Sequence, residues 1–167
     1  MWHFIFFKPY YFTRKCEIIV IIKAIFMKLT TKGRYAVMAM ADLALFKDKG
    51  PISLTDISLR QNISLAYLEQ IFIKLKNKNL VKSVRGAKGG YVLESSPEII
   101  KISNIIAAVD EEVKMLNCKK DSKKGCNNKS TKCITHNLWD QLDQHINNFF
   151  DKVKLQDLVI KKQTLNK

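Results

Sequence analysis

The sequence predicts a mainly α-helical fold with one small β-hairpin, and two patterns support this prediction. Apolar residues recur at intervals of three and four over most of the chain after residue 30, which is typical of helices that bury one face. Residues 80–93 instead place β-prone segments on both sides of a glycine-rich centre, which favours a hairpin. We therefore expect helices packed around a common core, with a two-stranded sheet attached.

The chain has 167 residues, enough for one domain or for a small domain with an appendage. Its hydrophobic content of 47% suffices for a packed core. Lysine and arginine number 29 against 15 aspartate and glutamate residues, a formal charge of +14. Such an excess favours a polyanionic partner, either nucleic acid or an anionic membrane surface.

Residues 1–26 differ in character from the rest, because they are aromatic and β-branched and are interrupted by charged residues. No uncharged run among them approaches the roughly 20 apolar residues of a membrane span. No small-residue cleavage site follows an apolar run either, so a secretory segment is not predicted. We expect this N-terminal extension to be disordered, or to lie upstream of a natural start at Met27. We also expect no membrane partner.

The chain contains four cysteines. In the absence of a secretory segment, they favour a reducing, cytoplasmic compartment. Clustered cysteines there are metal ligands or redox groups more often than structural disulfides. Cys16, which lies in the extension, is expected to take no part in such a site.

A first long helix is predicted from Thr30 to Phe46 by apolar residues at three- and four-residue spacing. Lys32 and Arg34 lie near its start, where cations oppose the positive end of the helix dipole. This placement predicts that an external anion binds there. The sequence Lys49-Gly50-Pro51 predicts that the helix has ended by this point.

Two shorter helices are predicted over about residues 54–77. Ser53 and Asp56 have the spacing of an N-terminal capping box for the first helix, and Ser64 is a candidate cap for the second. The second helix has an apolar face that suits a core and an opposite face of polar and aromatic residues. Two short helices joined by a tight turn predict a helix-turn-helix.

The hairpin predicted for residues 80–93 has a flexible, cationic tip, Arg85-Gly86-Ala87-Lys88-Gly89-Gly90. A helix-turn-helix followed by a basic hairpin is the arrangement of a winged helix. Residues 27–97 carry 12 Lys and Arg against 5 Asp and Glu, which weakens the alternative of core helices with a merely solvated hairpin. We predict a winged helix-turn-helix DNA-binding domain over residues 27–97, with double-stranded DNA as its partner.

Two further helical regions are predicted beyond the hairpin. In residues 98–116, Ser103 is a candidate cap for a linking helix that ends near Asp110-Glu111-Glu112. Residues 137–160 carry large apolar residues at helical spacing, namely Leu138, Trp139, Leu142, Ile146, Phe149 and Phe150. This region suits either an intramolecular core or a two-fold interface. We favour a dimerisation helix, because helix-turn-helix proteins usually bind paired half-sites as homodimers. Residues 161–167 form a tail.

Residues 117–136 hold potential metal ligands, with almost nothing apolar between them: Cys118, Cys126, Cys133 and His136. Such a polar segment cannot bury enough surface to order itself. Either a metal centre or a disulfide holds it, or it is a disordered basic linker. Three thiolates and an imidazole suit a structural zinc site and equally an iron–sulfur cluster. The lysines of the segment favour the thiolate form for either.

No catalytic constellation accompanies these cysteines, because no separate His/Asn or His/Asp pair around a pocket is indicated that would activate a nucleophile. We therefore expect a protein that is not an enzyme. A metal or cluster carrier is an alternative, and such a carrier would bind no specific DNA sequence.

From Met27 to about Val159 the chain resembles the IscR family of bacterial iron–sulfur cluster regulators. The resemblance lies in the segments MKLTTKGRYAVMAM, DISLRQNISLAYLEQIF, LVKSVRGAKGGYVL, AAVDEEV and CITHNLW. It implies a homodimeric winged-helix repressor that binds a 2Fe–2S cluster. In its cluster-loaded form such a protein represses the operon for iron–sulfur cluster assembly by binding promoter operators. Cluster-assembly scaffold proteins are further partners that this resemblance implies.

The resemblance also implies the site residues. The implied cluster ligands are Cys118, Cys126, Cys133 and His136. The residues implied for DNA binding are Ser64, Ala66, Tyr67, Glu69 and Gln70 on the recognition helix and Arg85 in the wing. The Glu69 carboxylate can accept a hydrogen bond from cytosine and so help to choose between sites. Arg85 suits insertion into the minor groove.

Two alternatives for the sensing chemistry stay open. A sister regulator of the same family would sense nitric oxide or redox state through the same cysteines, but it would not need a histidine at the position of His136. A zinc ion in place of the cluster would give a zinc-stabilised DNA-binding repressor.

Overall fold

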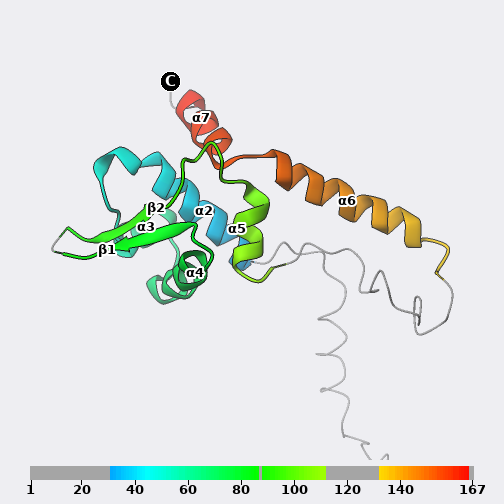
Figure 1. The fold of residues 1–167 in the computed structure, drawn as a ribbon, viewed down its shortest axis with the longest axis horizontal. Coiled ribbons are helices and arrows are strands. Elements are labelled where there is room, and N and C mark those ends of the chain that lie inside the picture. The colour runs from blue at the N-terminus through cyan, green and yellow to red at the C-terminus, as the bar shows by residue number, and fades with distance from the viewer. Residues whose placement is uncertain (1–30, 87, 112–131, 166–167) are drawn as a thin grey trace, which may run out of the picture.

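The structure is a computed structural model, and it describes residues 31–86, 88–111 and 132–165 (Figure 1). The predictions for residues 1–26, for Cys118 and Cys126, and for the end of the tail fall outside the described residues. Over the described ranges the fold is mostly helical with a small two-stranded antiparallel sheet, which confirms the predicted class.

The predicted helices and strands occur in the expected order, and two elements, the 3-10 turn and the last helix, were not predicted. The elements are α2 (Thr31–Leu45), a 3-10 turn η1 (Lys47–Lys49), α3 (Leu54–Gln61), α4 (Leu65–Asn77), β1 (Val81–Val84), β2 (Gly90–Leu93), α5 (Ile102–Ala108), α6 (His136–Lys152) and α7 (Leu155–Leu165).

Helix α2 forms the centre of the core, and α3, α4, α5, α7 and β2 all pack against it. Ala36, Ala39 and Met40 of α2 are fully buried, and the two alanines allow neighbouring helices to approach closely. Phe72 of α4 is also fully buried and meets the ring of Tyr91 from β2 edge-on, with 4.7 Å between ring centroids. Burial of these side chains supplies most of the free energy that holds the helices together.

The helix-turn-helix consists of α3 and α4. The Ser53 hydroxyl accepts a hydrogen bond from the backbone N–H of Asp56 at 3.1 Å, so the predicted cap of α3 is present. Asn62 ends α3 with a φ of 52°, in the left-handed region that asparagine tolerates. Ser64 is the N-cap residue of α4, but its side chain makes no capping hydrogen bond. Ser64 is exposed on the surface at the start of α4.

An ion pair between the exposed Arg60 and the buried Asp42 fixes α3 on α2. The Asp42 side chain is inaccessible to solvent and accepts hydrogen bonds from Arg60 Nη2 at 2.6 Å and from Gln61 Nε2 at 2.6 Å. The hydrogen bond to Asp42 raises the pKa of Arg60. The guanidinium also lies 4.5 Å from the centroid of the Phe46 ring. A carboxylate is tolerated inside a core only with partners of this kind.

The hairpin is docked through β2 and turns at a glycine. Strands β1 and β2 pair in register, with Val81 opposite Leu93, and Gly86 has a φ of 122°, which favours glycine. At the start of β2, the Tyr91 N–H donates to the Ile52 carbonyl at 2.8 Å. A Cβ at Gly90 would lie 2.4 Å from the same carbonyl oxygen. Only glycine therefore lets the wing approach the segment before α3 so closely.

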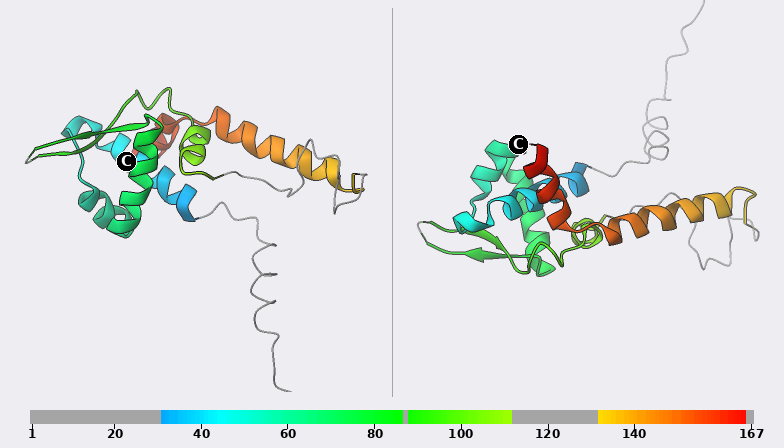
Figure 2. Two further views of the ribbon diagram at one scale, coloured as in Figure 1. Left: turned by 60° about the horizontal axis from the view of Figure 1, so that its bottom comes forward. Right: turned by 90° about the horizontal axis from the view of Figure 1, so that it is seen from above.

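Residues 137–160, expected to contain one dimerisation helix, contain two helices with different environments. The chain is extended at Val153, and the Lys154 N–H donates to the Asp157 carboxylate at 2.9 Å, which starts α7. Helix α7 then returns to α2 and buries Leu155 and Val159 in the same core as the helix-turn-helix. Helix α6 instead extends away from the other helices (Figures 1 and 2).

Helix α5 begins one residue before Ser103, with Lys101 as its N-cap, so the prediction that Ser103 caps this helix is wrong. The Ser103 hydroxyl instead donates to the Asp151 carboxylate of α6 at 2.6 Å, and Lys101 pairs with the same carboxylate at 2.9 Å. These contacts lower the pKa of Asp151. They join the start of α5 to the end of α6, which is the end nearest the core.

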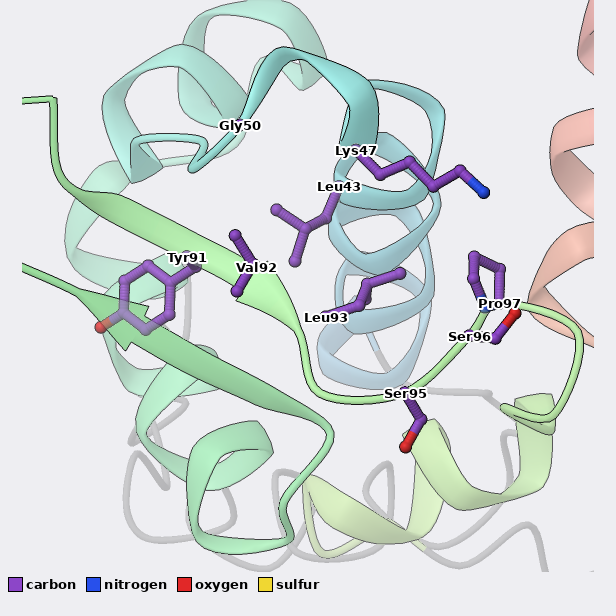
Figure 3. Close-up of a pocket in the computed structure, with 9 residues that line it drawn as sticks. All are labelled: Leu43, Lys47, Gly50, Tyr91, Val92, Leu93, Ser95, Ser96 and Pro97. Atoms are coloured by element: carbon purple, nitrogen blue, oxygen red, sulfur yellow. The ribbon is translucent and has the colours of Figure 1, made fainter.

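A cavity of about 340 Å³ lies between the end of α2 and the segment that follows β2 (Figure 3). Its lining residues are Leu43, Lys47, Gly50, Tyr91, Val92, Leu93, Ser95, Ser96 and Pro97. Leu43, Val92 and Leu93 lie close together in its wall (Figure 3). The polar side chains of the lining belong to Lys47, Tyr91, Ser95 and Ser96.

Candidate functional site

Helix α4 presents most of the residues predicted for DNA binding. Ser64, Ala66, Glu69 and Gln70 are all exposed, whereas Leu68 and Ile71 are buried. The helix therefore has one face in the core and one face of short and polar side chains on the surface. An exposed helix face of this kind can enter the major groove of DNA and contact base edges.

Tyr67 differs from its neighbours on α4, because it is half-buried. Its ring meets that of Tyr35 from α2 edge-on, with 5.8 Å between centroids and 87° between planes. The contact restricts the ring and ties the first turn of α4 to α2. Tyr67 therefore has a structural role in addition to the one predicted for it.

The wing carries exposed cations beyond the sheet. Arg85 is exposed at the tip, and so are Lys82 on β1 and Lys88 after the turn. Lys76 of α4 donates to the Ser83 hydroxyl of β1 at 3.0 Å. This contact holds the wing against the recognition helix, so both predicted DNA-binding surfaces belong to one packed unit.

Charged residues also join the end of α5 to α4 and α2. The Lys74 ammonium of α4 forms an ion pair and hydrogen bond with the Asp110 carboxylate. This hydrogen bond lowers the pKa of Asp110 and raises the pKa of Lys74. Lys32 of α2 lies beside Lys74, and the contact between the two lowers the pKa of Lys32.

The anion at the start of α2 comes from the chain itself. The backbone N–H of Gly33, in the first turn of α2, donates to Glu111 Oε2 at 3.0 Å. This N–H has no partner within the helix, and a carboxylate is favourable at the positive end of the helix dipole. Glu111 therefore supplies one negative charge at the start of α2, and the external anion expected near Lys32 and Arg34 stays a prediction.

Two of the four predicted metal ligands lie within the described residues. Cys133 is exposed, with its thiol 3.7 Å from the Thr135 hydroxyl. His136 is the first residue of α6 and is 7% exposed. Its backbone N–H donates to the Cys133 carbonyl at 3.0 Å. Cys118 and Cys126 lie outside the described ranges. Among the residues described, no group of three or more His, Cys, Asp or Glu gathers as a metal site.

The donors present fit the predicted centre in their chemistry. A tight turn, closed by the hydrogen bond from the His136 backbone N–H to the Cys133 carbonyl, places a cysteine and a histidine three residues apart at the N-terminal end of α6. Thiolate and imidazole are the ligand types of structural zinc sites and of histidine-ligated 2Fe–2S clusters. The short Cys133–His136 spacing therefore suits a pair of ligands to one centre, with the remaining positions open to the two other cysteines.

Three polar residues of this region were not predicted as functional. Lys76 braces the wing, and Asp110 and Glu111 contact α4 and α2. The sequence does contain an indication of the last two, because acidic residues oppose the negative end of a helix dipole. Their place at the end of α5 predicts cationic or N–H partners elsewhere in the fold.

Helix α6 has an exposed apolar face. Leu138 is 58% exposed, Trp139 38% and Phe149 62%. No helix in the described part of the chain is long and apolar enough to span a bilayer. Large apolar side chains gathered on one exposed helix face are typical of an interface.

Comparison with known proteins agrees with this arrangement. Residues 29–161 match the Rrf2 family, described as an iron-dependent transcriptional regulator. The chain is 50% identical over 134 residues to the HTH-type transcriptional regulator IscR of Aliivibrio salmonicida (strain LFI1238), which covers 80% of this chain and 78% of that relative.

Solved structures give the same result. The IscR structure of T. potens has a TM-score of 0.66 and 36% identity, over 81% of this chain and 88% of its own. CymR (YrzC), the global cysteine regulator of B. subtilis, has a TM-score of 0.68 and 34% identity, over 80% and 97%. These proteins are winged-helix regulators and not enzymes. The chain therefore belongs to the Rrf2 family of helix-turn-helix transcriptional regulators, in which it is similar to IscR.

Proposed function

We propose that this chain is a cytoplasmic, homodimeric repressor whose DNA binding depends on a 2Fe–2S cluster held by Cys118, Cys126, Cys133 and His136. The observation that carries the proposal is the turn that brings Cys133 and His136 together where α6 begins. His136 begins a helix, and Cys133 lies in the turn before it; the other end of this helix is tied to α5 through Asp151. We call residues 117–136 the cysteine loop. A centre bound there would join this loop to the body of the molecule.

The DNA-binding half of the proposal rests on two surfaces. The exposed face of α4 would enter the major groove with Ser64, Ala66, Tyr67, Glu69 and Gln70. Arg85, exposed at the wing tip, would reach the adjacent minor groove. Glu69 would favour cytosine through its acceptor oxygens and disfavour acceptor-rich base edges. The +14 charge supports attraction to the phosphate backbone.

The homodimer is supported by α6. Its exposed Leu138, Trp139 and Phe149 lie on a helix that leaves the globular part of the molecule (Figure 1). A second copy offers the same apolar face, so a two-fold axis would cover both helices at once. The resulting dimer would present two recognition helices to two half-sites of one operator.

When bound, the cluster would supply redox-sensitive iron chemistry and would cross-link ligands that are distant in sequence. The residues of the chain do the rest. His136 is held at the start of α6 in a nearly buried position, and Cys133 is fixed beside it by the turn. Binding of the cluster would therefore alter the chain at both ends of the cysteine loop, next to α5 and next to α6. The natural target is the operon for cluster assembly, with scaffold proteins as cluster donors.

The test is anaerobic purification followed by metal and sulfide analysis. A 2Fe–2S centre predicts a coloured protein with iron and sulfide each at about two per chain. His136→Ala and Cys133→Ala should lose this content, whereas His145→Ala on the exposed surface of α6 should retain it. A colourless protein with one zinc per chain would contradict the cluster and leave a zinc-stabilised repressor. The spectrum of a 4Fe–4S centre would favour the nitric-oxide or redox sensor instead.

A further inference from the structure

The end of α5 gathers four charged side chains from separate parts of the chain. We call this group the α5 corner; its members are Lys32 of α2, Lys74 of α4, and Asp110 and Glu111 after α5. Glu111 is the last described residue before the segment that holds Cys118 and Cys126. The corner therefore lies where the core ends and the cysteine loop begins.

The backbone at the corner has a defined turn. The Asp110 N–H donates to the Ala107 carbonyl at 3.1 Å, and the Glu111 N–H donates to the Ile106 carbonyl at 3.4 Å. Asp110 has a φ of 56°, in the left-handed region. These are the hydrogen bonds of a Schellman motif that closes a helix C-terminus. The turn fixes the backbone from which the side chains of Asp110 and Glu111 project.

The two carboxylates bind two different helices. Asp110 pairs with Lys74 in the last turns of α4, the proposed recognition helix. Glu111 accepts the hydrogen bond of the Gly33 N–H at the start of α2, the central helix of the core. These two consecutive residues thus contact α4 and α2 at once, before the segment that holds Cys118.

Local energetics alone do not explain acidic residues at this position. A carboxylate at the end of α5 opposes the dipole of that helix, and aspartate in the left-handed region is less favourable than glycine. Both groups are stabilised through α4 and α2. The α5 corner is therefore locally unfavourable but is stabilised by its contacts with other helices. Contacts of this kind are what couples two distant sites.

We propose that Asp110 and Glu111 are positioning residues that transmit the state of the cysteine loop to the recognition helix. The inference rests on the proposed function, since it names the route by which the cluster controls DNA binding. Ligation of Cys118 would constrain the backbone that leads directly from Glu111. A shift of this dipeptide moves the carboxylates that hold the last turns of α4 and the first turn of α2. The base-reading residues of α4 would then change position relative to the wing and to the partner subunit.

The variants are chosen so that the fold survives. Asp110→Asn removes the charge that pairs with Lys74 but keeps a residue that tolerates the left-handed backbone. Glu111→Ala removes the acceptor for the Gly33 N–H, and Glu111→Gln restores an acceptor without the charge. Asp48→Asn is the matched control, because Asp48 is an exposed carboxylate in η1, beyond the end of α2 that lies opposite Gly33.

The experiment measures DNA affinity of each full-length protein with and without its cluster, under anaerobic conditions. The probe is a duplex selected from a random pool by the cluster-loaded wild-type protein. We expect Asp110→Asn and Glu111→Ala to bring the ratio of the two affinities closer to one by about 2- to 30-fold. Glu111→Gln should recover most of the wild-type ratio, and Asp48→Asn should not change it.

A second measurement does not depend on DNA. Hydrogen exchange at the Gly33 amide and in the last turn of α4 should change when the wild-type cluster is removed, and should change less in Asp110→Asn and Glu111→Ala. A wild-type affinity ratio retained in both variants, with unaltered exchange, would overturn the link while leaving the proposed function intact. A wild-type protein without a cluster, or with an affinity ratio of one, would overturn the proposed function and the inference with it.

Discussion

The helix-turn-helix and helix α6 contrast in where their apolar side chains find partners. Phe72 of α4 is completely buried and packs against Tyr91, whereas Phe149 of α6 is 62% exposed. Both residues belong to amphipathic helices of similar length. The first helix is satisfied within one chain, and the second offers its apolar face to something else. We interpret α4 as part of a preformed DNA-binding unit, and α6 as an element completed by a second subunit.

The largest expected effect is on the stability of the core that contains the helix-turn-helix. Phe72→Ala should lower the free energy of unfolding by about 3–5 kcal/mol, because it removes a buried ring and leaves a cavity. Denaturant unfolding of the cluster-free protein measures this change. Phe149→Ala is the matched control and should cost much less in the monomer. Equal losses in the two variants would show that α6 is packed within its own chain.

The next effect concerns assembly. Leu138→Glu and Phe149→Glu each place a charge on the proposed interface and should weaken the dimer by about 2 kcal/mol or more, roughly 30-fold. Sedimentation measures the dimer dissociation constant. Asn148→Glu, an exposed polar site on the same helix, should have little effect. Dimers that withstand both apolar substitutions would place the interface elsewhere.

A smaller effect is expected at the wing. Arg85→Ala should weaken DNA binding by roughly 1–2 kcal/mol and reduce the slope of log affinity against log salt by about one, because one cation no longer contacts the DNA. Lys47→Ala removes an exposed cation from η1 and serves as the control. If Lys47→Ala weakened binding as much, net charge rather than the wing would account for the loss.

The smallest effect is a dependence of stability on pH. Hydrogen bonds from Lys74 and Ser103 lower the pKa of Asp110 and of Asp151, respectively. A pKa that is lower in the folded state stabilises the fold above the ordinary aspartate pKa of about 3.9. That stabilisation is lost as the pH falls through the folded-state value. Asp110→Asn and Asp151→Asn should therefore each lessen the fall in unfolding free energy between neutral and acidic pH. A fall identical to wild type would show that these exposed pairs contribute nothing.

The sequence predicted the helix-turn-helix and hairpin well because their determinants are local. Ser53 and Asp56 cap α3 at the expected spacing, and the glycines around Arg85 allow the hairpin to turn. The same local reasoning was wrong for Ser103, whose hydroxyl binds Asp151 of a helix far along the chain. A cap and a long-range contact use the same side chain, and only the fold decides between them.

Contacts between distant segments were the part that the sequence did not reveal. The return of α7 to the core depends on a break at Val153 that contains neither glycine nor proline. The pairing of Glu111 with the Gly33 N–H spans the whole winged helix. Of the proposed centre, Cys133 and His136 are placed by the structure, while Cys118 and Cys126 lie outside the described residues. The four-ligand set is therefore still a prediction.

The most direct test compares the DNA affinity of one protein preparation before and after its cluster is removed anaerobically. If α6 and the cysteine loop control a preformed DNA-binding unit, the affinity for the selected duplex should change at least about 5-fold. A change of this size corresponds to a coupling free energy of about 1 kcal/mol or more. Unfolding of the helix-turn-helix core should be nearly the same in both states. Equal DNA affinities in the two states would contradict the account.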